Sequence, residues 1–398
     1  MSSPIDSSLS RRQFLRAAGA GAVALGIGGI AAACSTPAAT SSPSSAPSTA
    51  AGGSSAPGGS AAPSASQAAA TGTFNWMTWS DHWYQAQLDN IGSNANIKTN
   101  ITELADNSDG YTKLKEVTGQ LDMISGDALW VPKYFESGLI EAWDINQLAV
   151  SKQLYSIARS FEIWTKPEGY LGYPFGWSPV QIYYDPAHVS PAPDSWQVLL
   201  DKKYAKRVVV ENQPVEIMAY MGKAAGVKDP YNMTPDEVLQ AKDLLKQLKP
   251  NILRLAQQNT DTVAALKSGE AWIATGNLGT DTRVKDQGGP ALNVFTPKEG
   301  TIGWMDSEMI VKGGANTNVI LPFLELAEQA EYVAANFILN GRPLFNEAAY
   351  KILVNQGQQE RADRFLYNKP ETVLTMTLKG PGASTQAAID AFNEVFGA

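Results

Sequence analysis

The sequence predicts an α/β protein whose folded part consists of two lobes. Segments with β-strand character alternate with helical segments through two successive series, and such alternation is typical of βαβ units around a mostly parallel sheet. The two series are similar in size, and no linker-like composition separates them. We therefore expect two adjoining lobes, each a sheet flanked by helices, with a ligand site in the cleft between them.

The chain begins with a predicted export signal, residues 1–33. The stretch Ser10-Arg11-Arg12-Gln13-Phe14-Leu15 is typical of a twin-arginine signal, and an uncharged apolar run follows it to Ala33. Cys34, the single cysteine, comes directly after this run and resembles the modified cysteine of a bacterial lipoprotein, although Ala31 stands where leucine is usual. We expect lipidation of Cys34, with simple cleavage or an incidental cysteine as the alternatives. No intramolecular disulfide is possible with one cysteine.

Residues 34–72 predict a disordered tether. Ser, Ala, Pro, Gly and Thr make up almost all of this stretch, and it has no charged or aromatic residue. Such a composition cannot bury enough apolar surface to fold. With a lipid at Cys34, the folded part would be held at the outer face of the cytoplasmic membrane or in the periplasm.

The remaining chain is long enough for two lobes with a sizeable core. The net charge of the 398 residues is −8, which disfavours nucleic acid as a partner. Ten tryptophans are compatible with ligand stacking, although most should lie in the core. We expect a monomer.

The elements follow in order from residue 73. In the first series, the patterns predict strands over 73–78, 97–104 and 121–125 and helices over 84–91, 111–117 and 129–137. In the second, they predict strands over 180–184, 207–210, 271–275, 292–295 and 301–311 and helices over 215–225, 235–248, 260–268 and 321–339. Thr234 and Glu237 form a capping box that starts the helix at Pro235.

The strand 301–311 carries the most informative pair of side chains. Trp304 and Asp306 are two residues apart, so they share one face of the strand. An indole face and a carboxylate together suit a protonated amine, through a cation–π contact and a charge-assisted hydrogen bond. The alternative is a core tryptophan beside an aspartate that caps the next turn.

Motifs of enzymes and metal sites are missing from the sequence. It contains no G-x-S-x-G, P-loop, dinucleotide fingerprint or H-E-x-x-H, and only His82 and His188 as histidines. We expect no catalytic residue, metal or cofactor. Two alternatives stay open: an iron site using Tyr183 and Tyr184, and an exported hydrolase using a pair of carboxylates.

Eight segments together, in order and spacing, resemble one family, the periplasmic spermidine/putrescine-binding proteins of ABC importers. They are Trp79-Ser80-Asp81, Gly138-Leu139-Ile140, 172–177 (GYPFGW), Asp194-Ser195-Trp196, 246–251 (KQLKPN), Ser268-Gly269-Glu270, 297–300 (PKEG) and 304–307 (WMDS). They extend over nearly the whole folded part.

This resemblance implies a two-lobed periplasmic-binding-protein fold of type II. Each lobe would be a mixed sheet flanked by helices, closing over a linear polyamine that carboxylates and aromatic rings hold. It implies crossovers near 177–180, at Trp304-Met305 and near Tyr350. The expected lobes are therefore residues 73–178 with 305–350, and residues 179–304 with 351–398.

The resemblance also assigns ligand-binding positions. Trp79, Glu216, Trp304 and Asp306 match the family's aromatic and carboxylate residues. Five other expected positions depart from the family: His82 replaces Tyr, Asp127 replaces Ser, Gln213 replaces a carboxylate, Asn277 replaces Trp and Arg342 lies near a Tyr. Leu129 also replaces a Tyr. Gln213 and Asn277 are alternatively turn residues, and Arg342 alternatively a solvated cation at a helix end.

The leader and the resemblance together imply an extracytoplasmic solute-binding lipoprotein of an ABC importer. Its expected ligand is spermidine, putrescine or a related small cationic amine, and its partners are a membrane permease and, through Cys34, the membrane. A zwitterion whose anionic end meets Arg342, such as an aminophosphonate or an amino-acid derivative, is the alternative ligand.

Overall fold

The computed structural model describes residues 70–117 and 119–397. The predicted signal, the lipidation site at Cys34 and most of the predicted tether lie outside the described residues. Gly72, which we assigned to the tether, is the first residue of strand β1 and pairs with Ile97. Within the described residues, no helix is both long and apolar enough to cross a membrane.

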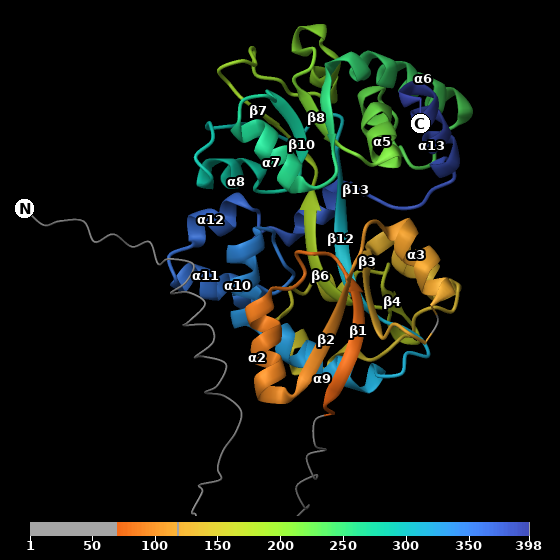
Figure 1. The fold of residues 1–398 in the computed structure, drawn as a ribbon, viewed down its shortest axis with the longest axis vertical. Coiled ribbons are helices and arrows are strands. Elements are labelled where there is room, and N and C mark those ends of the chain that lie inside the picture. The colour runs from red at the N-terminus through yellow and green to blue at the C-terminus, as the bar shows by residue number, and fades with distance from the viewer. Residues whose placement is uncertain (1–69, 118, 398) are drawn as a thin grey trace, which may run out of the picture.

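The described chain forms two lobes, one above the other in Figure 1. The lower lobe is built on a sheet with strand order β13-β12-β3-β1-β2, and β6 also pairs with β12. These strands are β1 (Gly72–Thr78), β2 (Ile97–Glu103), β3 (Met123–Asp127), β6 (Tyr173–Pro179), β12 (Thr301–Ile310) and β13 (Met376–Leu378). β1, β2 and β3 are parallel, whereas β12 is antiparallel to β3 and β6. The sheet is therefore mixed.

The upper lobe is built on a second sheet with strand order β11-β7-β10-β8-β9. Its strands are β7 (Gln181–Tyr184), β8 (Val208–Glu211), β9 (Ile252–Ala256), β10 (Ile273–Gly276) and β11 (Asn293–Phe295). β8 is parallel to β9 and β10, and β7 is antiparallel to β10 and β11. A separate hairpin joins β4 (Thr165–Lys166) to β5 (Gly169–Tyr170).

Helices cover both sheets. In the lower lobe they are α2 (Gln85–Ala95), α3 (Asn107–Glu116), α4 (Val131–Glu136), α9 (Ile320–Ala327), α10 (Ala330–Asn340), α11 (Glu347–Asn355) and α12 (Gln359–Arg364). In the upper lobe they are α5 (Pro214–Ala224), α6 (Pro235–Leu248), α7 (Asn259–Lys267), α8 (Thr280–Asp286) and α13 (Thr385–Phe396). The capping box predicted at Thr234 and Glu237 is present at the start of α6.

One predicted helix is wrong. Residues 321–339 form two helices, because the chain turns at Glu328 and Gln329, where Gln329 has an extended ψ of 142°. The carbonyl of Glu328 accepts a hydrogen bond from Asn346 Nδ2 at 3.0 Å. This contact satisfies a carbonyl that the end of α9 leaves without a helical partner.

The chain passes between the lobes at three places. β6 belongs to the lower sheet and β7 to the upper, with only Val180 between them. Along β12, Ile302 packs in the core of the upper lobe and Met305 in that of the lower. The third passage follows β13, since β13 still pairs with β12 and α13 then packs on α5 and α6. It therefore comes later than the crossover expected near Tyr350.

Candidate functional site

β12 presents three polar or aromatic side chains toward the junction of the lobes. Trp304, Asp306 and Glu308 alternate along this strand, so they point to the same face. Asp306 and Glu308 are almost fully buried, at 3% and 1% exposure. Buried carboxylates need partners, and the residues around them supply these.

His82 lies between the two carboxylates. Its Nε2 is 3.0 Å from Asp306 Oδ2 and its Nδ1 is 2.5 Å from Glu308 Oε1. Ionised carboxylates only accept hydrogen bonds, so a protonated ring that donates from both nitrogens satisfies this geometry. Burial and the charge of Arg342 lower the pKa of His82, but the charge of Glu308 and the hydrogen bonds to both carboxylates outweigh them and raise it above its usual range.

Arg342 is the second buried cation of the site. Its Nη1 lies 3.3 Å from Asp81 Oδ2 and 3.4 Å from Asp306 Oδ2, and its side chain is 4% exposed. The alternative of a solvated helix-end cation is therefore wrong. α10 ends at Gly341, which has a left-handed φ of 66°, and the chain then runs beside β6, where the carbonyl of Pro343 accepts from the amide of Trp177 at 3.3 Å.

The ring of Phe175 contacts both cations, His82 and Arg342. The pairing of β12 with β6 shifts register between Asp306 and Ser307 and leaves Phe175 as the extra residue of a bulge. Its ring stacks on His82 at a centroid distance of 4.2 Å and lies 4.8 Å from the guanidinium carbon of Arg342. The bulge thus turns an aromatic face toward the charged cluster.

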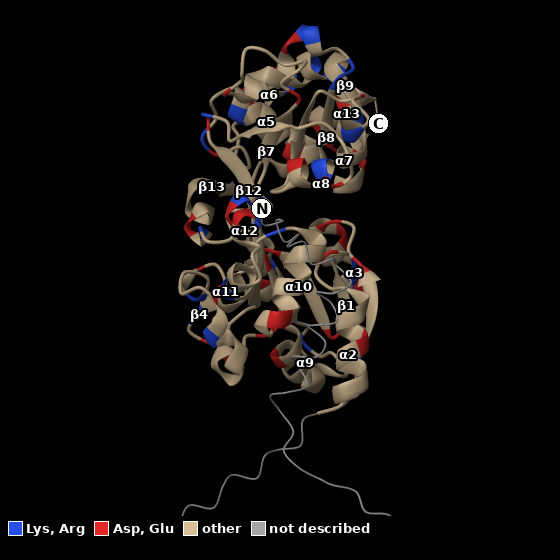
Figure 2. Ribbon diagram, turned by 90° about the vertical axis from the view of Figure 1, so that its left-hand side faces the viewer, with Lys and Arg blue, Asp and Glu red and all other residues tan. Residues whose placement is uncertain are grey.

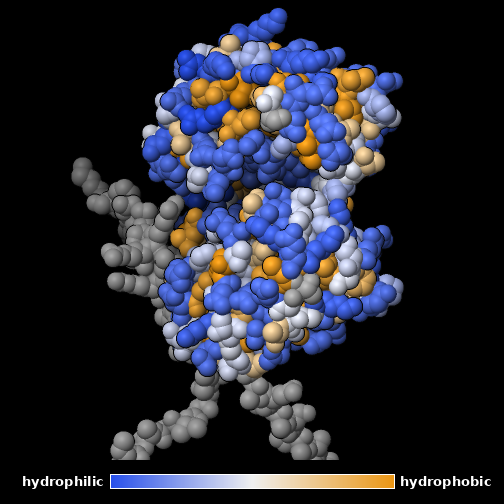
Figure 3. All heavy atoms as spheres, turned by 45° about the vertical axis from the view of Figure 1, so that its right-hand side comes forward, coloured by the Kyte–Doolittle hydropathy of each residue, from blue (hydrophilic) through white to orange (hydrophobic). Residues whose placement is uncertain are grey.

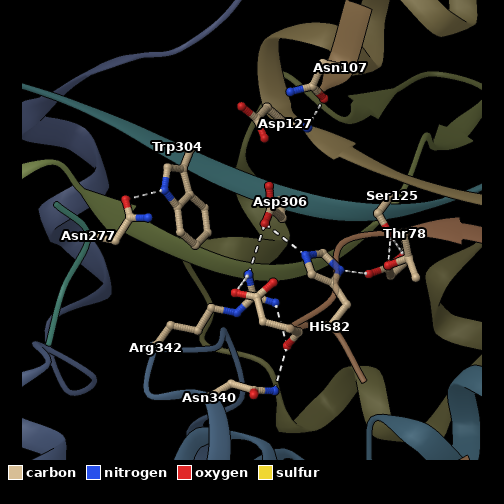
Figure 4. A network of polar contacts seen from close by, with 12 residues as sticks. Thr78, His82, Asn107, Ser125, Asp127, Asn277, Trp304, Asp306, Asn340 and Arg342 are labelled. Atoms are coloured by element: carbon tan, nitrogen blue, oxygen red, sulfur yellow. Dashed lines mark hydrogen bonds and ion pairs between the residues drawn. The ribbon is translucent and has the colours of Figure 1, made fainter. Parts of the chain in front are cut away.

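Asp127 faces Asp306 from the neighbouring strand. The two residues are cross-strand partners of β3 and β12, and Figure 4 shows their carboxyl groups turned toward each other. Burial and the charge of Asp306 raise the pKa of Asp127 well above its usual range. Burial also raises the pKa of Asp306, but hydrogen bonding and charge from His82, with the charge of Arg342, lower it overall. The pKa values of the two carboxyl groups are therefore shifted in opposite directions.

One oxygen of Asp306 is left over by these contacts. Oδ2 contacts His82 Nε2 and Arg342 Nη1, whereas the buried Oδ1 has no nitrogen or hydroxyl donor in the part of the chain that the structure describes and faces only the Asp127 carboxyl group. An ammonium group between Asp127 and Asp306 would satisfy both carboxyl groups.

Trp304 is held by a residue of the upper lobe. Its Nε1 donates to Asn277 Oδ1 at 3.0 Å, and Asn277 follows directly after β10. The indole is half-buried, and the guanidinium of Arg342 lies 5.5 Å from its centre. Asn277 follows a strand of the upper sheet, and Trp304 lies on the strand that joins the lobes. The indole of Trp304 therefore lies at the junction of the two lobes.

Glu216 lies in a second polar cluster, in the upper lobe. It stands in the first turn of α5, is 8% exposed and accepts a hydrogen bond from Tyr231 Oη at 2.5 Å. Burial raises the pKa of Glu216, and the charge of Lys379 acts against this rise. Lys379 also lies near Asp127, so the two clusters adjoin.

The structure brings together six of the nine positions expected from sequence: His82, Asp127, Asn277, Trp304, Asp306 and Arg342. Glu216 belongs to the adjoining cluster. Trp79 follows β1 and packs on the core of the lower lobe, with its buried Nε1 unpartnered among the described residues. Gln213 is the exposed residue before α5, and its side chain does not cap the helix.

The sequence analysis did not identify four residues that contact or adjoin the site. Glu308 was accessible to it, because the alternation that pairs Trp304 with Asp306 continues to Glu308. Phe175 lies in segment 172–177, which carries part of the family resemblance, but its orientation depends on a bulge that the sequence does not reveal. Lys379 and Tyr231 gave no local signal.

The tyrosines of the iron alternative have internal partners. Tyr183 Oη donates to the carbonyl of Asn277 at 2.8 Å, and Tyr184 Oη accepts from Asn293 Nδ2 at 3.2 Å. In residues 70–117 and 119–397, no group of three or more His, Cys, Asp or Glu side chains is placed to hold a metal ion.

The surface is hollowed between the lobes and hydrophilic there, as Figure 3 shows. Acidic and basic residues both occur along this boundary in Figure 2. The site residues come from the carboxyl ends of β3 and β10 and from the crossing strand β12. This is where open α/β sheets bind ligands.

Comparison with known proteins matches most of the folded chain. The profile of a family described as bacterial extracellular solute-binding protein matches residues 86–356. The spermidine/putrescine-binding periplasmic protein of Salmonella typhimurium is 27% identical over 319 residues, which cover 77% of this chain and 86% of that protein.

Solved structures share the fold at lower identity. One is the spermidine/putrescine ABC transporter substrate-binding protein PotD from Streptococcus pneumoniae (TM-score 0.66, 17% identity, 81% of this chain and 98% of that one). Another is the PBP MotA from A. tumefaciens B6, in complex with glucopine (TM-score 0.63, 15% identity, 81% and 99%). The predicted two-lobed, type II binding-protein fold is confirmed.

Proposed function

The chain belongs to the family of bacterial extracellular solute-binding proteins, and we propose that it captures a small organic amine outside the cytoplasm and delivers it to the permease of an ABC importer. Polyamines are the first candidates, because the relatives at 27% identity are named for spermidine and putrescine. Membership of a family of binding proteins favours capture over hydrolysis.

One observation carries the proposal: Asp127 and Asp306 form a carboxyl pair beside the indole of Trp304. Burial and the charge of Asp306 raise the pKa of Asp127. An ammonium group between the two carboxyl groups would offset this charge, and it would meet Asp306 Oδ1, which has no nitrogen or hydroxyl donor among the described residues. The ring of Trp304 adds a cation–π contact of about 0.5–2 kcal/mol. A cation satisfies both contacts, and the contact with the indole face depends on the positive charge.

Capture would close the two lobes. Trp304 lies on the crossing strand and is bound to Asn277 of the upper lobe, while Asp127 belongs to the lower lobe. A ligand held by all three would stabilise the closed arrangement over the open one by its preferential affinity for the closed form. A permease could then distinguish the loaded protein by its shape.

A zwitterionic amine is a second candidate ligand. The buried guanidinium of Arg342 has an Nε without a partner among the described residues, and such a group can bind an anionic oxygen. A protein of similar fold binds glucopine. This candidate keeps the ammonium at Asp127 and Asp306 and adds an anionic end near Arg342.

The location follows from the leader. We propose export by the twin-arginine route and lipidation of Cys34, which would tether a monomeric binding protein to the outer face of the membrane. Mass spectrometry of the mature N-terminus tests this point. A diacylated Cys34 is expected, and an unmodified mature chain that begins elsewhere would contradict it.

Calorimetric titration of the purified folded part tests the function. The panel is spermidine, putrescine, choline, aminophosphonates and amino acids. We expect saturable binding of at least one amine with one ligand per chain. Absence of heat with every amine would contradict the proposal, and binding of a zwitterion with no heat from spermidine or putrescine would favour the second candidate.

A further inference from the structure

Lys379 places an ammonium group between the two lobes. It directly follows β13, and its backbone amide donates to the carbonyl of Gly303 at 2.8 Å. Its Nζ lies 3.4 Å from Glu211 Oε2, at the carboxyl end of β8, and the side chains of this pair are only 7% and 12% exposed. Lys379 is thus a buried cation that links the crossing strand to the upper sheet.

The backbone beside Lys379 is fixed by a close approach to the lower lobe. A Cβ on the next residue, Gly380, would lie 2.3 Å from Cβ of Leu129. Glycine is therefore required at position 380, and the backbone there packs closely on Leu129, two residues after Asp127. Lys379 consequently enters the junction from a defined point.

The surroundings keep Lys379 charged. Burial lowers its pKa, but Glu211, Tyr220, Glu216 and Asp127 act against burial and raise the pKa well above its usual range. Glu216 and Asp127 are the carboxyl groups of the two polar clusters on either side of the junction. The ammonium group of Lys379 is therefore paired with Glu211 and interacts electrostatically with Glu216 and Asp127, two carboxyl groups of the proposed site.

The other buried cations of the junction also have carboxylate partners within the protein. Arg342 and His82 both contact Asp306. Glu216 accepts a hydrogen bond from the hydroxyl of Tyr231. Among the described residues, Asp306 Oδ1 is a buried oxygen of this junction without a hydrogen-bond partner, and it faces the Asp127 carboxyl group. This position accommodates one ligand ammonium.

We propose that Lys379 occupies the position of a second ligand ammonium group, so that the cleft selects amines with a single ammonium group over diamines such as putrescine. The inference rests on the proposed amine-binding function and narrows it from polyamines, which the names of the relatives favour, to amines with a single ammonium group. The ligand ammonium binds between Asp127 and Asp306, and its other end, neutral or anionic, points toward Lys379. A second ammonium there would meet a like charge with little water to screen it.

Three ligands that differ mainly in the charge at one end test this selection on the unmodified protein. Putrescine carries two ammonium groups, N-acetylputrescine carries one and a neutral amide, and 4-aminobutanoate carries one and a carboxylate. Calorimetric titration should give at least one single-ammonium ligand a dissociation constant about tenfold or more below that of putrescine, as expected for one unfavourable charge contact.

The variant Lys379→Met removes the charge and keeps most of the side-chain length. We expect it to bind putrescine about tenfold more tightly than the unmodified protein does, because Glu211 and Glu216 become available to the second ammonium. Glu211→Gln retains Lys379 and should not gain putrescine affinity. Lys298→Met, which removes an exposed lysine paired with Asp194, is the matched control and should leave all three affinities unchanged.

The outcomes separate the inference from the function beneath it. Putrescine binding to the unmodified protein more tightly than both single-ammonium ligands, or with the same affinity in Lys379→Met, overturns the role of Lys379 and leaves amine capture intact. Absence of binding by all three and by the wider amine panel overturns amine capture and this inference with it. The ligand series on the unmodified protein decides the matter even if Lys379→Met does not fold.

Discussion

Asp306 and Asp127 are cross-strand partners on β12 and β3, and they differ sharply in their surroundings. Asp306 has His82 and Arg342 against one oxygen, whereas Asp127 faces Asp306 itself. The pKa of Asp306 is lowered and that of Asp127 raised. The two carboxyl groups therefore repel each other when both are ionised, and an ammonium group between them would offset this repulsion. The proposed amine site rests on this difference.

Asp306→Asn should weaken binding of any amine ligand by about tenfold or more, since a charge-assisted hydrogen bond contributes about 1.5–3 kcal/mol. Calorimetric titration measures the change. Asp243→Asn is the matched control, because Asp243 is an exposed aspartate paired with Lys246 on α6. An affinity that is equal in Asp306→Asn and the control would remove this carboxylate from the site.

Trp304→Leu should weaken amine binding by about 2- to 30-fold, the range that corresponds to loss of a cation–π contact of 0.5–2 kcal/mol. Asn277→Ala should have a smaller effect, because it removes the hydrogen bond to the indole but leaves the indole itself in place. Combining the two changes should add little to Trp304→Leu alone, because Asn277 would act through the indole. Fully additive losses in a titration series would show that Asn277 acts independently.

Asp127→Asn should stabilise the unliganded protein at neutral pH. The pKa of Asp127 is raised in the folded state, so above the ordinary value of about 3.9 the folded protein holds a proton that the unfolded chain releases. The free energy of unfolding therefore falls as pH rises through this window. Asp127→Asn has no carboxyl group to titrate, so its stability does not fall in this way. Its melting temperature should exceed that of the unmodified protein at pH values above the raised pKa of Asp127, and should match it below the ordinary value.

Thermal unfolding from pH 3.5 to 8 measures this difference. A melting temperature of Asp127→Asn that stays equal to, or below, that of the unmodified protein throughout would contradict the raised pKa. The same variant should lose amine affinity, which separates stability from binding at this position.

His82→Gln should destabilise the protein, and most strongly at acidic pH. The folded pKa of His82 is raised, so its stabilising charge is fully present below the unfolded value of about 6.5 and is lost as pH rises through the folded value. Removing one partner of a buried ion pair costs about 3–5 kcal/mol. Denaturant unfolding at pH 5.5 and 9 should show a smaller difference at the higher pH.

A difference between His82→Gln and the unmodified protein that is the same at both pH values would mean that His82 stabilises by packing on Phe175 rather than by charge. His188→Gln is the control, since His188 is a partly exposed histidine paired with Asp185.

The sequence predicted the parts of the fold that depend on local pattern. Alternation gave β1, β2 and β12 nearly to the residue, and a capping box gave the start of α6. The break between α9 and α10 could not be predicted, because helical periodicity continues through Glu328 and the turn there depends on Asn346 from a later segment. The passage after β13 was misplaced for the same reason, since its strand is three residues long and pairs with β12.

The site was predictable where its chemistry lies on one strand. Alternation placed Trp304 and Asp306 on one face of the strand, the family resemblance marked them as expected ligand-binding residues, and the same alternation reaches Glu308. The partners of these residues come from β1's end, from the chain after α10 and from the chain after β13. Arg342 and Lys379 occupy their places through Gly341, Gly380 and strand pairing, which act over distances in sequence that no local pattern reports.

A crystal structure of the protein with its tightest-binding amine tests the central claim most directly. We predict one ammonium nitrogen within hydrogen-bonding distance, about 3 Å, of both Asp306 Oδ1 and the Asp127 carboxylate, with the adjoining carbon chain against the indole of Trp304. An amine bound away from this carboxyl pair, or a cleft in which Asp127 and Asp306 keep their contact without a ligand nitrogen between them, would contradict the account.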